Sequence, residues 1–426
     1  MTQNNKNYTS AIFFIGILFF IFGFITWANS QLIPYLKIAC ELTDTQSYLV
    51  ATAFFAAYFF MAIPSSLVLK KTGFKNGMSV GLIIMALGAL LFVPAAKTRN
   101  YSLFLAGLFI IGTGLALLQT ASNPYVAALG PIDSAAKRIS IMGICNKIAG
   151  ILSVYILGNI TLKNVDELKI KLTTLGVEEK TIELNMLASK VIVPYLIIAA
   201  VLILLAVIFY FMNLPEIQEE NVTSKGSPKT SVMQYPHLLL GALAIFFYVG
   251  VEVISYDTFA SFGEYLGFPL QQSKSFASYT GYGLLAGYIL SIIAIPKFIS
   301  QRTALIVANV LSIFLVVLAT TTNGYLAVIC FALLGFSNSV MWPAIWPLAL
   351  EGLGKFTKIG SALLIMGIVG GALLPPFYGK IGELVHSKQS AYLILIPCYL
   401  YILYFAVSGH KAGLQEKPTN SPPFDV

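Results

Sequence analysis

Charge is the scarcest property of this 426-residue chain, because only 10% of its residues are Asp, Glu, Lys or Arg, whereas 57% are apolar. The mean hydropathy is +0.81. A soluble domain typically carries about 25% charged residues, which keep its surface in water. The composition therefore excludes a soluble domain and indicates a chain that crosses a membrane many times.

Histidine and cysteine are also too few and too scattered to build a metal or catalytic centre. The three histidines lie near the ends of apolar stretches: His237, His386 and His410. The four cysteines form no paired motif: Cys40, Cys145, Cys330 and Cys398. A disulfide framework or metal site needs such residues in groups, and an intramembrane hydrolase needs a buried histidine beside its nucleophile or metal. We therefore expect no enzyme, no metal and no bound cofactor.

Long uncharged stretches are what the chain has in abundance. Most are one membrane span long: residues 8–36, 45–69, 76–96, 100–132, 191–215, 275–296, 359–379 and 389–409. Residues 303–350 form a run about twice as long as a bilayer needs, and the polar turn 320–324 divides it into two helices. Two more spans, 139–162 and 238–256, carry a single charge each. The sequence therefore predicts twelve transmembrane helices.

Basic residues are unevenly divided between alternate loops. If the N-terminus is cytoplasmic, the inner loops hold Lys70, Lys71, Lys75, Lys137, Arg138, Lys225, Lys229, Lys297, Arg302, Lys355 and Lys358. The outer loops then hold Lys37, Lys97, Arg99, Lys274, Lys380 and Lys388. The positive-inside rule predicts that both termini are cytoplasmic, and the net charge of +8 reflects this topology. No basic cluster is interleaved with stacking aromatics, so we expect no nucleic-acid partner.

The chain divides near its middle. After the sixth span come an acidic segment and a stretch rich in Ser, Thr, Lys and Pro, a composition typical of an exposed linker. We therefore expect an N-terminal six-helix bundle at 1–213, a cytoplasmic linker at 214–236 and a C-terminal six-helix bundle at 237–426. The one long outer loop, 163–190, is rich in Glu, Leu and Lys, and its composition is compatible with an external helix.

A faint internal repeat supports the division into two halves. Residues 128–129 followed by 141–144 resemble residues 349–350 followed by 365–368, since both read Ala-Leu and then Ile-Met-Gly-Ile. Parallel repeats of this kind predict two pseudo-symmetric bundles with a binding site between them, near the middle of the membrane.

A polar string interrupts the fourth span: Gln119-Thr120-Ala121-Ser122-Asn123-Pro124-Tyr125. Amides at mid-depth persist where they face other helices or a water-filled cavity. Gln119 and Asn123 are four residues apart and share one helical face, where their donors and acceptors match sugar hydroxyls. Hydrogen bonding between helices is the alternative role.

Two spans place a charge deep in the membrane. Glu252 lies mid-span with Tyr248 and Tyr256 four residues to either side, so a carboxylate and an aromatic wall share one face. A charged carboxylate at this depth must be paired, protonated or hydrated. Lys147 follows Asn146 in the fifth span and is a candidate for cation coupling. Alternatively, Lys147 and Glu252 form a structural pair, or Lys147 extends to the membrane surface.

An aromatic stripe marks the tenth span. Asn338, Trp342 and Trp346 recur every four residues, and Trp27 in the first span offers a second aromatic face. Aromatic faces stack on sugar rings and indole N–H groups donate to hydroxyls, so Trp342 is a candidate substrate contact. Packing or location at the membrane interface is the alternative role of each tryptophan.

Several motifs resemble those of known transporters. The segment Leu69-Lys70-Lys71-Thr72-Gly73-Phe74-Lys75 resembles a reduced form of the loop signature of the major facilitator superfamily. More specific are residues 29–36, residues 118–125, Met341-Trp342-Pro343-Ala344-Ile345, Gly352-Leu353-Gly354-Lys355 and Gly370-Gly371-Ala372-Leu373-Leu374-Pro375. In this order they resemble the fucose/glucose/galactose permease branch over nearly the whole chain.

The resemblance implies an all-α membrane protein with the major facilitator fold, monomeric and multi-pass in a bacterial inner membrane. It implies alternating-access import of a monosaccharide with a co-transported cation, sodium or proton, and glucose or galactose is the expected substrate. A fucose or other monosaccharide permease, or a transporter-like sugar sensor without flux, has the same sequence features. A channel is not favoured, because repeated charged rings and filter loops are absent.

This chain differs from the fucose-type permeases at two positions, and both differences concern how sugar transport is coupled to a cation. Fucose-type permeases carry an Asp where this chain has Ser30 and a Glu where it has Gln119, and neither replacement titrates. Glucose/galactose-type members tend to have the glutamine and an acid like Glu252. We therefore predict coupling roles for Glu252 and Lys147. The predicted substrate contacts are Asn29, Gln119, Asn123, Asn146, Tyr248, Glu252, Asn338 and Trp342.

Overall fold

The computed structural model describes residues 3–128, 135–212, 231–295, 297–353 and 356–414. The described residues of the first half form α1 (Gln3–Trp27), α2 (Asn29–Ala39), α3 (Asp44–Ser47), α4 (Leu49–Leu90), α5 (Phe92–Lys97), α6 (Tyr101–Ala128), α7 (Ala135–Thr161), α8 (Val165–Thr174), α9 (Val177–Ser189) and α10 (Ile192–Phe211).

The second half is helical in the same way. Its elements are η2 (Val232–Gln234), α11 (Pro236–Asp257), α12 (Phe259–Tyr265), α13 (Leu270–Ser273), α14 (Phe276–Ala294), α15 (Gln301–Thr321), α16 (Gly324–Asn338), α17 (Met341–Leu350), α18 (Thr357–Met366), η4 (Gly367–Val369), α19 (Gly370–Leu384), α20 (Lys388–Ala391), η5 (Tyr392–Ile394), α21 (Leu395–Val407) and η6 (Gly409–Lys411). The described residues contain no strand.

Twelve membrane crossings follow from these helices. Among the described residues, eleven segments are long and apolar enough to span a bilayer, and the longest of them, Asp44–Lys97, holds two crossings. Its helix α4 is interrupted at Gly73, whose φ of 72° and ψ of 174° are not helical. Glycine adopts positive φ without steric cost, so the chain can reverse there. Eleven segments, one of them double, give twelve crossings, and the predicted all-α membrane fold is confirmed.

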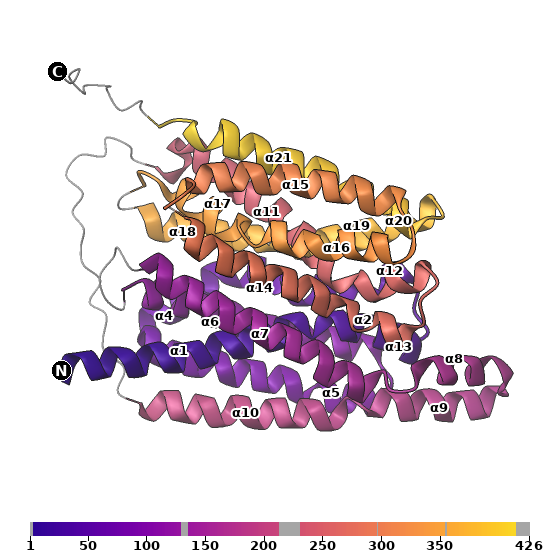
Figure 1. Ribbon diagram of the computed structural model, residues 1–426. Coiled ribbons are helices and arrows are strands. Elements are labelled where there is room, and N and C mark those ends of the chain that lie inside the picture. The colour runs from indigo at the N-terminus through magenta and orange to yellow at the C-terminus, as the bar shows by residue number, and fades with distance from the viewer. Residues whose placement is uncertain (1–2, 129–134, 213–230, 296, 354–355, 415–426) are drawn as a thin grey trace, which may run out of the picture.

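The helices are arranged in two groups that lie against each other (Figure 1). Helices α1, α4 to α7 and α10 fill the lower part of the view, and α11, α12 and α14 to α21 fill the upper part. The groups meet where α4 packs on α19 and where α7 packs on α14. The predicted linker 214–236 lies largely outside the described residues, so the predicted domain boundaries stay a prediction.

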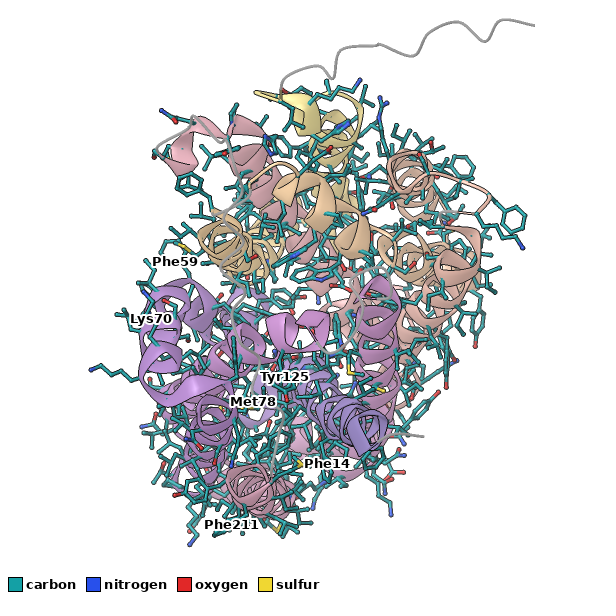
Figure 2. The ribbon with its side chains drawn as sticks, turned by 90° about the vertical axis from the view of Figure 1, so that its left-hand side faces the viewer. Phe14, Phe59, Lys70, Met78, Tyr125 and Phe211 are labelled. Carbon is teal, nitrogen blue, oxygen red and sulfur yellow. The ribbon has the colours of Figure 1, made fainter. Side chains whose placement is uncertain are left out.

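Apolar side chains cover the outside of the bundle as well as its core. Phe60, Leu67 and Phe211 are more than half exposed, and an end-on view shows Phe211 at the periphery and Met78 inside (Figure 2). Water disfavours so much apolar surface, whereas the hydrocarbon of a bilayer accepts it. The exposed belt therefore faces lipid.

The predicted external helix between the fifth and sixth spans is two helices. α8 and α9 form a hairpin that projects beyond the bundle at the end opposite the start of α1 (Figure 1). Lys171 of α8 and Glu183 of α9 form an ion pair that joins the two helices. On the predicted topology the end of the molecule that carries α3, α8, α9, α13 and α20 faces outward, and we call it the outer end.

Close helix contact within the second group depends on glycine. A Cβ on Gly370 would lie 1.8 Å from the carbonyl oxygen of Phe246, so α19 and α11 touch through backbone. A Cβ on Gly176, between α8 and α9, would meet no heavy atom within 4 Å.

We expect Gly370→Val to lower the thermal stability of the purified protein in detergent, because added atoms would push α19 away from α11. Overpacking costs typically about 1–3 kcal/mol. Gly176→Ala is the matched control and should melt like the wild type. Equal melting temperatures for all three proteins would contradict the contact described here.

Candidate functional site

A buried ion pair joins the two groups of helices in the middle of the bundle. Lys147 Nζ of α7 lies 2.9 Å from Glu252 Oε1 of α11, and each residue is only 7% exposed. The sequence left open whether these two charges meet, and in the structure they do. Each charge neutralises the other, which allows both to remain ionised in a poorly hydrated place.

Aromatic rings enclose the lysine side of this pair. Lys147 Nζ lies 4.2 Å from the centroid of the Trp27 ring, a cation–π distance. The Trp27 ring packs against Tyr256 with centroids 4.2 Å apart, and its Nε1 donates to Asn146 Oδ1 at 3.3 Å. Gly150 makes room for the indole, since a Cβ there would lie 2.4 Å from Trp27 Cδ1. Trp27, Asn146, Lys147, Glu252 and Tyr256 thus form one cluster, which we call the central cluster.

A second aromatic group continues from the central cluster along α11 to α17. Tyr248 lies one helical turn before Glu252, and its ring centroid is 6.2 Å from that of Trp342. Trp342 stacks on Trp346 at 5.1 Å, and both tryptophans are half-buried. The aromatic stripe predicted from the sequence therefore forms a wall next to the ion pair.

The other predicted contacts have separate partners. Gln119 is half-buried and its Nε2 donates to the Tyr58 hydroxyl at 2.9 Å. Asn338 accepts from the Tyr399 hydroxyl at 3.0 Å and donates to Ser255 Oγ at 3.4 Å. These hydrogen bonds join different helices. Such bonding is the role that the sequence analysis gave as the alternative to sugar contact.

Three further residues from the sequence analysis are Asn29, Ser30 and Asn123. Asn29 is fully buried, and neither amide atom has a hydrogen-bond partner within the described chain. Ser30 donates to the carbonyl oxygen of Trp27 at 2.8 Å, so its hydroxyl closes a local turn. The side chain of Asn123 lies outside the described residues, although its backbone is helical.

A polar network that the sequence did not reveal closes the outer end. Lys388 Nζ of α20 lies 3.0 Å from Asp44 Oδ2 of α3, and Lys37 Nζ lies 2.6 Å from Asp44 Oδ1. Lys388 also donates to Ser261 Oγ at 2.7 Å. We call Lys37, Asp44, Thr45, Ser261, Glu383 and Lys388 the outer gate.

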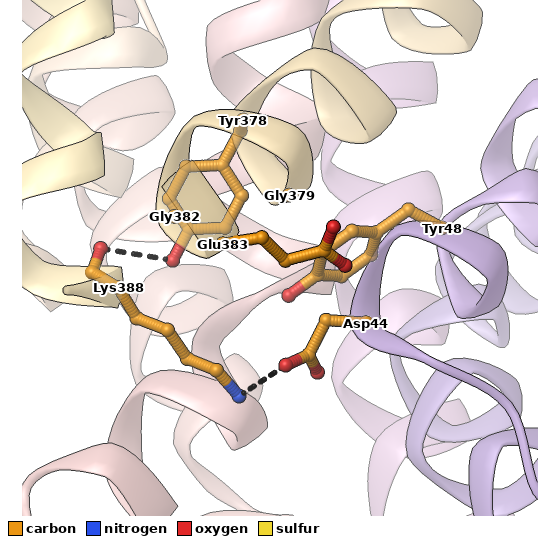
Figure 3. A pocket seen from close by; sticks show the side chains of 7 residues that line it. All are labelled: Asp44, Tyr48, Tyr378, Gly379, Gly382, Glu383 and Lys388. Atoms are coloured by element: carbon orange, nitrogen blue, oxygen red, sulfur yellow. Dashed lines mark hydrogen bonds and ion pairs between the residues drawn. The ribbon is translucent and has the colours of Figure 1, made fainter. Parts of the chain in front are cut away.

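The outer gate joins the two halves of the chain (Figure 3). Thr45 Oγ1 donates to Glu383 Oε1 at 2.7 Å, beside the contact of Asp44 with Lys388. The gate surrounds a cavity of about 60 Å³, which Tyr48 and Tyr378 also line. Nearby, Lys169 of α8 pairs with Glu264 of α12. In this structure the two halves are therefore closed against each other at the outer end.

Asp257 is a buried carboxylate that the sequence analysis passed over. It is the last residue of α11 and is 2% exposed. No hydrogen bond reaches its Oδ1 within the described residues. It lies one residue beyond the predicted span 238–256, and only the fold shows that it is buried, in a helix that packs against α2.

Comparisons with known proteins agree with this geometry. The model of a family described as the Major Facilitator Superfamily matches residues 15–375. The chain is 34% identical over 414 residues to a glucose/galactose transporter of Brucella abortus, covering 96% of this chain and 97% of the relative. It is 29% identical over 410 residues to an L-fucose-proton symporter of Escherichia coli, covering 94% and 93%.

A solved structure has the same fold. It is the crystal structure of the Major Facilitator Superfamily transporter FucP in the outward conformation, with a TM-score of 0.73 and 28% identity. The match covers 94% of this chain and 98% of that one.

The central ion pair generates a test of stability. Glu252→Gln leaves the Lys147 ammonium buried without a counter-charge, and breaking a buried pair in this way costs about 3–5 kcal/mol. We expect this variant to melt well below the wild type in detergent. The double variant Lys147→Gln/Glu252→Gln removes both charges and should recover most of the loss. Additive losses in the double variant would show that the two charges do not interact.

Proposed function

Because this chain belongs to the Major Facilitator Superfamily, we propose that it is a secondary active transporter that takes up a hexose together with a cation, sodium or proton. It is a multi-pass membrane transporter and not an enzyme. Glucose or galactose is the proposed substrate. The relative from Brucella abortus named glucose/galactose transporter, which aligns along nearly the full length of both chains, supports this choice.

The observation that carries the proposal is the position of the Lys147–Glu252 pair. The pair links α7 of the first half to α11 of the second half in the middle of the bundle. A major facilitator transporter holds its substrate at such an interface near mid-membrane, and its halves rock around it. A group at this place contacts both halves, so a ligand bound to it can favour one arrangement of the halves over the other.

The surrounding side chains fit a sugar chemically. Hydroxyl groups both donate and accept, so they can bond to the Glu252 carboxylate, the Lys147 ammonium and the Asn146 amide. The rings of Trp27 and Trp342 offer flat apolar faces for the C–H surface of a pyranose. We propose Gln119, Asn123, Tyr248, Asn29 and Asn338 as further members of the site.

The remaining assignments complete the proposal. We propose that the protein is a monomer of the bacterial inner membrane with both termini cytoplasmic, which the asymmetry of basic loop residues supports. The two six-helix bundles, 1–213 and 237–426 with a linker at 214–236, move relative to each other. The closed outer gate then corresponds to a conformation in which the periplasmic side is shut.

We expect proteoliposomes that contain the purified protein to accumulate labelled glucose or galactose when a sodium or a pH gradient is imposed separately. Labelled fucose serves as the competing substrate. Binding of hexose without flux would identify a sensor, and neither binding nor flux with any of the three sugars would refute the proposal.

We expect Lys147→Gln/Glu252→Gln to lose concentrative hexose uptake while remaining folded, because the charges that respond to the sugar and its cation are gone. The control is Lys171→Gln/Glu183→Gln, which removes the ion pair of the external hairpin and should accumulate sugar like the wild type. Undiminished accumulation by the first variant would remove the central pair from the mechanism.

A further inference from the structure

Two carboxylates lie five residues apart near the end of α11, and they differ in their partners. Glu252 is neutralised by Lys147, whereas Asp257 has no ion pair within the described residues. Both side chains are more than nine-tenths buried. An ionised carboxylate without a partner is far more costly to bury than a neutral one, because it loses its hydration and gains no compensating charge.

The charged groups around Asp257 are already committed to other partners. Ser261, one helical turn further out, accepts from Lys388, and that lysine also pairs with Asp44. Lys37 pairs with Asp44 as well. Lys274 of the neighbouring loop donates to the carbonyl oxygens of residues 158 and 162. None of these three ammonium groups pairs with Asp257 in the part of the chain that the structure describes.

The titratable groups next to Asp257 are two phenols and one acid. Tyr256 precedes Asp257 in α11, and Thr258, which follows it, shares a hydrogen bond with the Tyr392 hydroxyl at 2.7 Å. Glu252 lies five residues earlier in the same helix, and a like charge nearby raises the cost of a second negative charge. All the surrounding groups thus favour a neutral side chain at this position when the outer gate is closed.

Asp257 is connected to the outer gate through neighbouring side chains. The gate cavity of about 60 Å³ is lined by Tyr378, whose ring stacks on Tyr392, and the Tyr392 hydroxyl lies 2.7 Å from the hydroxyl of Thr258, the residue after Asp257. One water molecule needs about 10–15 Å³ of such space. Separation of α3 from α20 would open this cavity to water and hydrate the carboxyl group (Figure 3).

We propose that Asp257 is the outer proton-binding site of the transport cycle, and that the outer gate closes only after its carboxylate has taken one proton from the outer solution. The carboxylate becomes a neutral carboxyl group, the hydronium ion or buffer acid that supplied the proton is left as water or as the buffer base, and no other bond changes. The direction of proton movement rests on the proposed function, because the proton is taken up from the side from which the sugar enters.

A proton suits this site better than a sodium ion does. Sodium is a hard cation that binds through several oxygen ligands at once. A proton needs one oxygen. The described residues also contain no group of three or more acidic, histidine or cysteine side chains that could hold a metal ion.

Protonation of Asp257 and protonation of Asp44 are expected to have opposite effects on the opening of the outer gate. Acid would protonate Asp44 and break its pairs with Lys37 and Lys388, which would open the gate. Acid would also neutralise Asp257, which by our proposal closes the gate. The two carboxylates therefore act in opposite directions, and the matched variants Asp44→Asn and Asp257→Asn should shift the gate in opposite directions.

The experiment measures the accessibility of the gate without any sugar. A reporter cysteine is placed by Gly382→Cys, because Gly382 lines the gate cavity and a Cβ there meets atoms only at 3.7 Å and beyond. The four native cysteines are replaced by serine. Right-side-out vesicles are then labelled with a membrane-impermeant maleimide across a range of outer pH. Labelling of Val177→Cys, at a site on the hairpin that is 86% exposed, corrects for the reactivity of the thiol itself.

We expect the corrected labelling of Gly382→Cys to rise as the outer pH rises, by up to about tenfold per pH unit for one proton. Added Asp257→Asn should hold labelling low and independent of pH, whereas added Asp44→Asn should raise it. Normal labelling of Val177→Cys in the Asp257→Asn background shows that this variant is folded and inserted.

Three results would overturn the assignment. These are an unchanged pH dependence in Asp257→Asn, opening of the gate by acid in the Asp44→Asn background, where the competing effect of Asp44 is absent, and closure driven by sodium at constant pH. The readout does not involve hexose, so a protein that fails to transport any sugar would refute the proposed function and leave this test intact.

Discussion

The structure depends on one requirement: charged side chains buried in the bundle must be neutralised, because neither lipid nor the packed interior can hydrate them. The bundle holds a lysine and a glutamate at its centre, and they survive there because Lys147 and Glu252 meet at 2.9 Å. The rings of Trp27 and Tyr256 complete the enclosure. Since one partner comes from each half of the chain, the pair also fixes how α7 and α11 face each other. The same constraint makes Asp257 conspicuous, because it is buried without such a partner.

Two positions distinguish this chain from the fucose-type permeases that its sequence resembles. On that resemblance, Ser30 and Gln119 stand where those permeases carry acids, and in the structure both are engaged in neutral hydrogen bonds. The buried ion pair of this chain lies instead between α7 and α11. A charge on α11 belongs to the second half of the chain, so it contacts different helices from a charge at position 30 or 119.

Hydropathy alone was sufficient to predict the twelve crossings, because a lipid-facing helix must be apolar along its whole length. It also placed Glu252 and Lys147 correctly as the exceptional residues of their spans. The outer gate could not be predicted. Asp44 and Lys388 are ordinary loop charges in the sequence, and only the packing of α3 on α19 and α20 brings them together. Asp257 was missed for the same reason, since its burial depends on the packing of other helices around α11, among them α2.

When the residues of the outer gate separate, water can replace their hydrogen bonds. When the residues of the central cluster separate, it cannot. Asp44 and Lys388 lie at a surface, so water molecules can take over each hydrogen bond as it breaks. Lys147, Glu252 and Trp27 lie where water is scarce, and their contacts have no such substitute. A rotation of one half against the other therefore meets least resistance when its axis passes through the central cluster. Around such an axis a small angle moves the two ends of the molecule far and the middle hardly at all, so the external hairpin travels the longest arc.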